Sequence, residues 1–357
     1  METPIERAAF SDRMAYVCAE LSNLAYFPWN GDASQDELTE TIIRFVKNEK
    51  LAKTISATIH SKIASNKVAP AAALQAFKDI LEDKDFTLVG QPFESNGTEA
   101  FICTREYKTP SGQDKTVAFL SFRGTQLTSY KDIKSDLDAG SETIDHKGEK
   151  LRFHRGFLAY YGQVREQVEQ TLKGLDYDQL FITGHSLGGA AAVIATRLIE
   201  GEINGACYTF GAPPVGDKSL QYGLKTPIYQ IVNDMDVVPN LPSPWLAWFF
   251  ILIIWLIRFA GTILAPVRWV TGGNWDERAE NFLRDISDYQ HQGYVSYLIG
   301  SRQKARLRIN VPFFRKLQYA IGKLYQTTPL RFGKKLVADH SIKVYVEKLR
   351  YHGEGRN

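Results

Sequence analysis

The sequence Gly184-His185-Ser186-Leu187-Gly188 is the feature that most constrains the fold. It fits the pattern G-x-S-x-G, in which a serine occupies a sharp turn between a strand and a helix. The apolar run 180–183 before it is typical of a buried strand, and the helix-forming residues 189–200 follow at once. Glycines allow a turn that is too tight for larger side chains. The pattern predicts a nucleophile elbow with Ser186 as the nucleophile, and the alternative is a structural serine turn.

Strands and helices alternate along the rest of the chain after residue 86. Apolar runs bounded by Gly, Pro, Asn and Ser predict strands at 87–89, 99–103, 116–122, 206–210 and 228–232. This alternation predicts an α/β fold with a mostly parallel central sheet flanked by helices. The first 85 residues instead show apolar residues three and four apart, which predicts helices. We expect a helical N-terminal part over 1–85, packed on a catalytic domain over 86–357.

An activated serine needs an acid and a histidine, which follow it in the order Ser, Asp or Glu, His in this kind of fold. Two aspartates compete at the end of the predicted strand 228–232, namely Asp234 and Asp236. The position favours Asp236 as the triad acid, and Asp234 stays open. The simpler reading of either is a solvated carboxylate in a loop.

Two histidines lie downstream of these acids. His340 stands in a late loop just before the amphipathic helix predicted over 342–349, whereas His291 lies at the edge of a strand-like run. A histidine in a late loop can reach the top of the sheet, so His340 is the preferred base and His291 the alternative.

Acyl transfer also needs donors for the oxyanion. The backbone N–H of Leu187 directly follows the nucleophile, and Thr125, at the end of the strand 116–122, offers an amide and a hydroxyl. This chemistry needs no metal and no organic cofactor, and we expect neither.

The motifs together resemble the class 3 lipases, the fungal-type triacylglycerol lipases and their bacterial relatives. In chain order they are FRGT (122–125), HRGF (154–157), GHSLGGA (184–190), TFGAPPVGD (209–217) and VNDMDVVP (232–239). The resemblance implies an α/β-hydrolase fold and hydrolysis of carboxylic esters of lipids through an acyl-enzyme. It implies Ser186 as nucleophile, Asp236 as acid and Thr125 as an oxyanion donor.

The resemblance also extends to the chain's end. Asp339-His340 with Tyr345 looks like the family's terminal D-H-x-x-x-x-Y segment, and His291 lies in a stretch that resembles the strand with the family's non-catalytic histidine. The apolar insertion between Asp236 and His340 departs from the family pattern, which leaves the lid and the substrate preference open.

This insertion covers residues 244–270, and residues 245–257 include no polar side chain. A single membrane crossing would put Asp236 and His340 on opposite sides of the bilayer, so the insertion has to lie on one membrane face, cover the site as a lid, or pack as a core helix. Tryptophans favour the membrane interface. The residues expected to dock on a membrane or form the lid are Trp245, Trp248, Phe249, Phe250 and Trp255.

Residues 301–338 carry ten Lys or Arg and no Asp or Glu. Within them, 311–326 show apolar residues on one helical face with basic residues at its margin, which predicts an interfacial amphipathic helix attracted to anionic lipid. The alternative is a helix packed on the domain with a solvated basic face. Nucleic-acid binding is disfavoured because no recognised module accompanies the charge.

The chain as a whole adds few constraints. Its net charge is only +3, and its cysteines, Cys18, Cys103 and Cys207, fit neither a disulfide framework nor a metal site. The start lacks a basic segment followed by an apolar run, so we expect a cytoplasmic or peripheral membrane protein, or export by a signal-independent route. No protein partner is indicated.

The expected function is therefore a serine lipase or esterase acting on acylglycerols or phospholipids at a membrane or lipid interface. The alternatives are a phospholipase-type toxin, a soluble short-chain esterase and a catalytically inactive membrane-associated scaffold.

Overall fold

The structure is a computed structural model, and it describes residues 9–31, 35–46, 70–109, 111–125, 140–199, 204–233, 236, 238–240, 288–309 and 339–354. The predicted apolar insertion, with Trp245, Trp248, Phe249, Phe250 and Trp255, lies outside the described residues, as do Asp234 and residues 310–338. Of the helices in the described ranges, none has the length and apolar character needed to span a bilayer.

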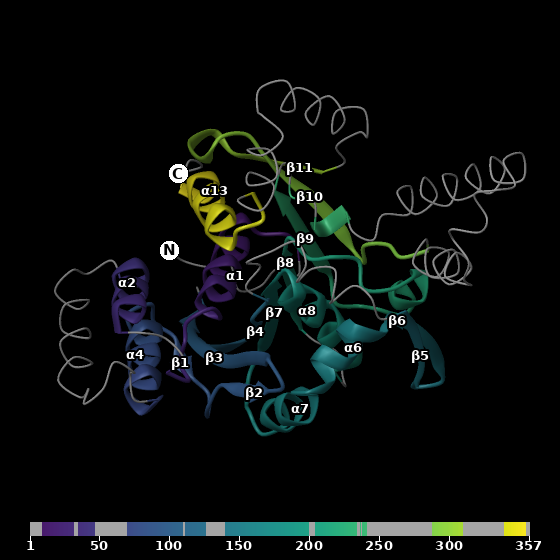
Figure 1. Cartoon of the computed structure of the whole chain (residues 1–357), viewed down its shortest axis with the longest axis horizontal. Coiled ribbons are helices and arrows are strands. Elements are labelled where there is room, and N and C mark those ends of the chain that lie inside the picture. Colours follow the sequence, from purple (N-terminus) through teal and green to yellow (C-terminus); the bar gives the residue numbers. More distant parts are fainter. Residues whose placement is uncertain are drawn as a thin grey trace, which may run out of the picture.

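Nine strands of the described chain form one central sheet (Figure 1). Five neighbouring strands are parallel, in the order β4-β7-β8-β9-β10, while β1, β2 and β3 at one edge and β11 at the other pair antiparallel. The strands are β1 Thr87–Leu88, β2 Phe93–Ser95, β3 Thr98–Lys108, β4 Asp114–Phe122, β7 Gln179–His185, β8 Gly205–Phe210, β9 Ile228–Asn233, β10 Tyr294–Ile299 and β11 Arg306–Ile309. The predicted mostly parallel sheet is confirmed.

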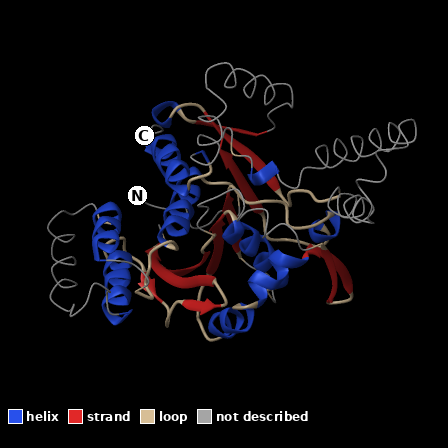
Figure 2. Ribbon diagram, viewed as in Figure 1, coloured by secondary structure: helices blue, strands red, loops and turns tan. Residues whose placement is uncertain are grey.

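Helices cover both faces of this sheet (Figure 2). One face carries α1 Asp12–Leu24 and α13 Ile342–Glu354, with α2 Gln35–Phe45 and α4 Pro70–Glu82 packed into the same apolar cluster. The other face carries α6 Arg155–Gly162, α7 Arg165–Lys173 and α8 Leu187–Leu198. A hairpin of β5 Ser141–His146 and β6 Glu149–His154 stands apart as a second, two-stranded sheet. Short 3-10 turns complete the fold: η1 Lys218–Gln221, η2 Val238–Asn240 and η4 Arg302–Lys304.

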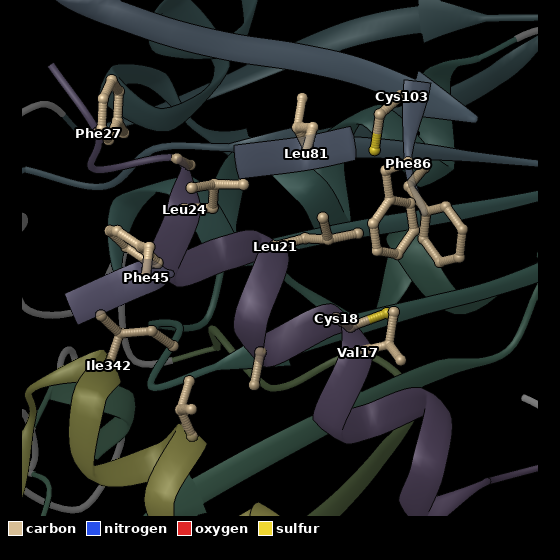
Figure 3. Close-up of a cluster of buried hydrophobic side chains, with 14 of the residues drawn as sticks. Val17, Cys18, Leu21, Leu24, Phe27, Phe45, Leu81, Phe86, Cys103 and Ile342 are labelled. Atoms are coloured by element: carbon tan, nitrogen blue, oxygen red, sulfur yellow. The ribbon is translucent and has the colours of Figure 1, made fainter. Parts of the chain in front are cut away.

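Alternation along the strands divides the interior into two cores. On β4, Val117 and Phe119 enter the cluster under α1 and α13, whereas Ala118 and Leu120 enter the cluster under α8. Because both faces are buried, these central strands read as continuous apolar runs in the sequence. Figure 3 shows the core under α1 and α13, where side chains of α1 such as Leu21 pack against those of neighbouring elements.

The structure extends several of the predicted elements and adds others. The strand predicted at 99–103 runs from Thr98 to Lys108, because β3 stays paired with β4 out to the polar pair Lys108 and Asp114. The helix after the elbow begins at Leu187 rather than at residue 189. Helices α1, α2 and α4 precede the first strand, and α1 packs directly on β7 and β8. The division of the chain into two parts at residue 85 stays a prediction.

Candidate active site

Ser186 occupies the turn between the end of β7 and the start of α8. Its backbone has φ 57° and ψ −127°, a combination that costs about 1–3 kcal/mol for a residue with a side chain and persists only where the surroundings enforce it. Its N–H donates to the carbonyl of Phe210 at 2.9 Å, which fixes the turn to β8. The geometry is that of a nucleophile elbow.

Two glycines make this turn feasible. A Cβ on Gly184 would collide with the carbonyl oxygen of Gly188, and one on Gly188 would collide with that of Phe122. The G-x-S-x-G spacing therefore reflects close backbone approach between β4, β7 and α8.

Asp236 and His340 form a buried pair. Nδ1 of His340 lies 2.7 Å from Oδ2 and 2.9 Å from Oδ1 of Asp236, and the two side chains are 5% and 0% exposed respectively. The N–H of Val238 also donates to Asp236 Oδ1, at 3.0 Å. Because the carboxylate accepts from Nδ1, the neutral ring keeps its free lone pair on Nε2. That nitrogen is buried and has no hydrogen-bond partner among the described residues.

His185, the residue before Ser186, holds the His340 loop against the elbow. Its Nε2 lies 2.6 Å from the carbonyl oxygen of His340, and the two ring centroids are 4.6 Å apart. Its Nδ1 lies 2.8 Å from the hydroxyl oxygen of Tyr26. Burial lowers the pKa of His185 well below its ordinary value, and His340 lowers it further. A neutral His185 donates from Nε2 to the carbonyl, so Nδ1 accepts from Tyr26.

Tyr345 supports the acid from its other side. Its hydroxyl lies 2.5 Å from Asp236 Oδ2 and accepts from the backbone N–H of Asn233 at 2.9 Å. Burial, followed by the nearby Asp236, raises the pKa of Tyr345 well above 10. The phenol therefore stays protonated and donates to the carboxylate, as do the His340 ring and the Val238 N–H.

The two candidate oxyanion donors lie beside Ser186. Leu187 is the first residue of α8, where N–H groups have no intrahelical partner and point out of the helix end. Thr125 follows Gly124, on which a Cβ would lie 3.2 Å from the Ser186 Cβ and 2.5 Å from the Tyr26 hydroxyl. Residue 124 therefore packs directly on the elbow and brings Thr125 to its side.

The strand end that carries Thr125 is braced. Arg123 makes a largely buried ion pair with Glu99 at 2.5 Å, and its carbonyl accepts from the Tyr160 hydroxyl at 2.7 Å. Its guanidinium also lies 5.7 Å from the ring centroid of Tyr26. The FRGT segment is thus held from two sides. Its role in binding an oxyanion stays a prediction.

His291, the alternative base, has a different place. Its Nδ1 lies 2.6 Å from Gln230 Oε1 and its Nε2 lies 2.7 Å from the Pro239 carbonyl oxygen. With both nitrogens engaged, the ring braces the η2 turn that follows Asp236 rather than offering a lone pair to a serine. The structure thus pairs Asp236 with His340, packs His340 against His185, the neighbour of Ser186, and engages both ring nitrogens of His291 elsewhere. The assignment of Ser186, Asp236 and His340 as a triad stays a prediction.

Sequence reasoning missed Tyr26, because it assigned no chemistry to the N-terminal helices. An aromatic residue just after a periodic apolar stretch carries no signal that separates it from core. Among the described residues, no group of three or more His, Cys, Asp or Glu side chains is placed to hold a metal ion. Cys18, Cys103 and Cys207 are buried free thiols.

Comparison with protein families places residues 119–245 in the profile described as "Lipase (class 3)". Among curated proteins, the chain is 38% identical to a lipase of Rhizomucor miehei over 145 residues, which are 37% of this chain and 39% of that lipase. It is 28% identical to Toxin TseL of Vibrio cholerae over 202 residues, and these residues make up 54% of this chain and 29% of the toxin. A phospholipase A1-II 1 of Oryza sativa is 29% identical over 171 residues, covering 40% of this chain and 43% of the enzyme. The chain thus spans less than half the length of these relatives.

Solved lipases also superpose on the chain. The native Rhizomucor miehei lipase propeptide complex gives a TM-score of 0.43 at 19% identity, covering 78% of this chain and 74% of that one. A triacylglycerol lipase described by its serine-protease triad gives a TM-score of 0.45 at 18% identity, covering 84% of this chain and 85% of that one.

Proposed function

Taking the chain as a member of the class 3 lipase family through residues 119–245, we propose that it hydrolyses carboxylic esters of lipids with Ser186 as the nucleophile. The observation that carries this proposal is the His340–Asp236 pair beside the strained Ser186 turn. Nδ1 of His340 is bound to Asp236, whereas its buried Nε2 has no hydrogen-bond partner among the described residues and can accept the serine proton.

The first half of the reaction forms an acyl-enzyme. His340 Nε2 takes the Ser186 hydroxyl proton as the oxygen attacks the ester carbon, while Asp236 holds the ring and stabilises the imidazolium. The N–H of Leu187, with Thr125, stabilises the oxyanion of the tetrahedral intermediate. His340 then gives its proton to the leaving alcohol.

Water completes the cycle. His340 removes a proton from a water molecule that attacks the acyl carbon, and the returning proton goes to the Ser186 oxygen as the fatty acid leaves. Every step uses side chains and amides of this chain, and a water molecule is the second substrate.

The substrate class is a lipid ester presented at an interface. Relatives named as lipases and as a phospholipase A1 support lipid esters in general. The described part of the basic segment favours an anionic surface, because Lys304, Arg306 and Arg308 are exposed in and beside the edge strand β11. The apolar insertion 244–270 and the segment 301–338 are our proposed docking elements, which makes the chain a peripheral membrane protein.

Phospholipid is the preferred lipid in this proposal. The basic strand and the relative named as a phospholipase A1 support it over neutral acylglycerol. We keep triacylglycerol as the second candidate because other relatives are named as triacylglycerol lipases.

The test measures fatty-acid release from anionic phospholipid vesicles, from triacylglycerol emulsion and from a soluble short-chain ester, with Ser186→Ala as the control. Release from vesicles that the control loses supports a phospholipase. Release from emulsion alone makes the enzyme a neutral lipase. Release only from the soluble ester contradicts interfacial action, and release that survives in Ser186→Ala contradicts the nucleophile.

A matched pair of charge reversals tests docking separately. Arg308→Glu changes the basic edge strand, and Lys108→Glu makes the same change on β3, near the opposite edge of the sheet. Each basic residue near an anionic membrane contributes about 1 kcal/mol, so reversal removes about 2 kcal/mol, or about thirtyfold in vesicle affinity. Equal affinities of the two variants in a vesicle sedimentation assay contradict docking through β11.

A further inference from the structure

A buried lysine lies behind the acid and the base. Lys348 is on α13, one turn after Tyr345, and only 4% exposed. Its Nζ donates to Asn233 Oδ1 at 2.6 Å and to the Leu298 carbonyl at 3.4 Å. A buried ammonium is strongly unfavourable unless it is well bonded, so this placement needs a compensating role or partner.

Its closest partner, Asn233, is the last residue of β9 and also contacts Asp339 and Tyr345, which hold His340 and Asp236 in place. The Asn233 Nδ2 donates to the Asp339 carbonyl at 2.6 Å, and its backbone N–H donates to the Tyr345 hydroxyl at 2.9 Å. The side-chain amide has only one orientation that fits, because the ammonium requires an acceptor and the carbonyl requires a donor. Lys348 therefore fixes which way the amide of Asn233 points.

This orientation controls the position of His340. The peptide of Asp339 and His340 is held at two consecutive carbonyls, the first by Asn233 and the second by His185. Without the ammonium the buried Oδ1 of Asn233 loses its donor, and the amide is no longer fixed in the position from which Nδ2 reaches the Asp339 carbonyl. The loop that carries His340 then loses one of its two anchors.

The same residue controls the Tyr345 proton. Since the Asn233 N–H occupies a lone pair of the Tyr345 oxygen, the hydroxyl hydrogen is left to point at Asp236 Oδ2, 2.5 Å away. Asn233 thereby supports both partners of the pair, His340 through the Asp339 carbonyl and Asp236 through Tyr345.

We propose that Lys348 and Asn233 form a clamp that positions the His340–Asp236 pair for proton transfer. Neither residue touches the reacting atoms, so both are positioning residues. The proposal rests on the proposed function, because a clamp on an inactive pair has no effect on turnover.

The experiment compares kcat, KM and Tm for a soluble p-nitrophenyl ester in Asn233→Asp and Lys348→Met. Asn233→Asp keeps the side-chain volume and gives Lys348 a carboxylate partner, so we expect an unchanged or higher Tm. It also places an acceptor against the Asp339 carbonyl, so we expect kcat to fall about ten- to hundredfold with KM within about twofold, as small misplacements of catalytic groups do. Lys348→Met should lower kcat similarly, and Lys348→Arg should restore part of it.

The matched control is Lys343→Met, an exposed lysine on the same helix, which should keep the wild-type kcat. A purely structural role predicts a loss of Tm with the kcat of the folded enzyme unchanged, and that result overturns the clamp. If Lys348→Met lowers kcat by the same factor in wild type and in an Asn233→Leu background, Lys348 does not act through Asn233, which also overturns it. Wild-type enzyme that hydrolyses neither this ester nor lipid esters in vesicles or emulsion instead overturns the proposed function.

Discussion

Gly211→Ala is the substitution that tests the site geometry with the smallest chemical change. Gly211 follows β8 with φ +61°, and its N–H donates to the Ile231 carbonyl at 3.0 Å. A Cβ there would lie 2.7 Å from Asp236 Oδ2, 3.0 Å from the Tyr345 hydroxyl and 3.1 Å from His340 Cε1. One methyl group therefore meets all three parts of the acid-base assembly.

Two effects of this methyl group can be separated by magnitude. The left-handed backbone costs about 1–2 kcal/mol for any residue with a Cβ, and this lowers stability alone. The contact with Asp236 forces the carboxylate or the ring to shift by several tenths of an ångström. Misplacement on this scale costs up to about a hundredfold in kcat, or about 2.7 kcal/mol of transition-state stabilisation. The upper limit for the loss of kcat is about 10⁴-fold, which is the cost of replacing the acid of a catalytic triad by its amide.

Gly97→Ala is the matched control, because Gly97 has φ +80° in the β2–β3 turn and its added Cβ would meet no atom within 4 Å. Urea denaturation should give both variants a loss of about 1–2 kcal/mol from backbone strain. Ester hydrolysis, measured with the protein fully folded, should fall only in Gly211→Ala. Equal kcat in both variants would refute the placement of Asp236, Tyr345 and His340 around residue 211.

Three further substitutions test the histidines and Tyr26. His340→Gln should lower kcat by at least about 10⁴-fold with a small change in Tm, whereas His291→Gln should lower Tm and keep most of kcat; the reverse ranking would make His291 the base. Burial depresses the pKa of His185, so below about pH 6.5 the unfolded chain binds a proton that the folded chain does not. Stability is therefore full above that pH and falls as pH decreases, by up to about 1.36 kcal/mol per unit, and His185→Gln should flatten this slope in urea titrations from pH 7.5 to 5. Tyr26→Phe leaves His185 Nδ1 without its donor and should cost about 1–3 kcal/mol of unfolding free energy; an unchanged value contradicts that hydrogen bond.

The sheet was predictable because its central strands are buried on both faces. A continuous apolar run such as 180–183 favours a strand buried on both faces. The glycines around Ser186 indicate a turn in which neighbouring backbones approach closely. The ends of β3 were not predictable, since its last residues are polar and are held by pairing with β4 rather than by burial.

The residues of the candidate site were also predictable only in part. Ser186, Asp236 and His340 were chosen from sequence order and loop position. The structure pairs Asp236 with His340 and places His340 against His185, next to Ser186, and the role of the three residues as a triad stays a prediction. Tyr26 and Lys348 escaped notice because their roles depend on contacts between residues far apart in sequence, Tyr26 with His185 and Lys348 with Asn233. Neither residue type nor spacing encodes such contacts, and a lysine on an amphipathic helix is ordinarily assigned to solvent.

Labelling with a fluorophosphonate probe shows whether Ser186 is an activated nucleophile. Only a serine whose proton can pass to a base reacts at a useful rate, and peptide mass spectrometry locates the modified residue. We expect one modified site, Ser186, with labelling that falls sharply in His340→Gln and disappears in urea. Labelling elsewhere in the chain, or an unlabelled Ser186 in the folded protein, would contradict it.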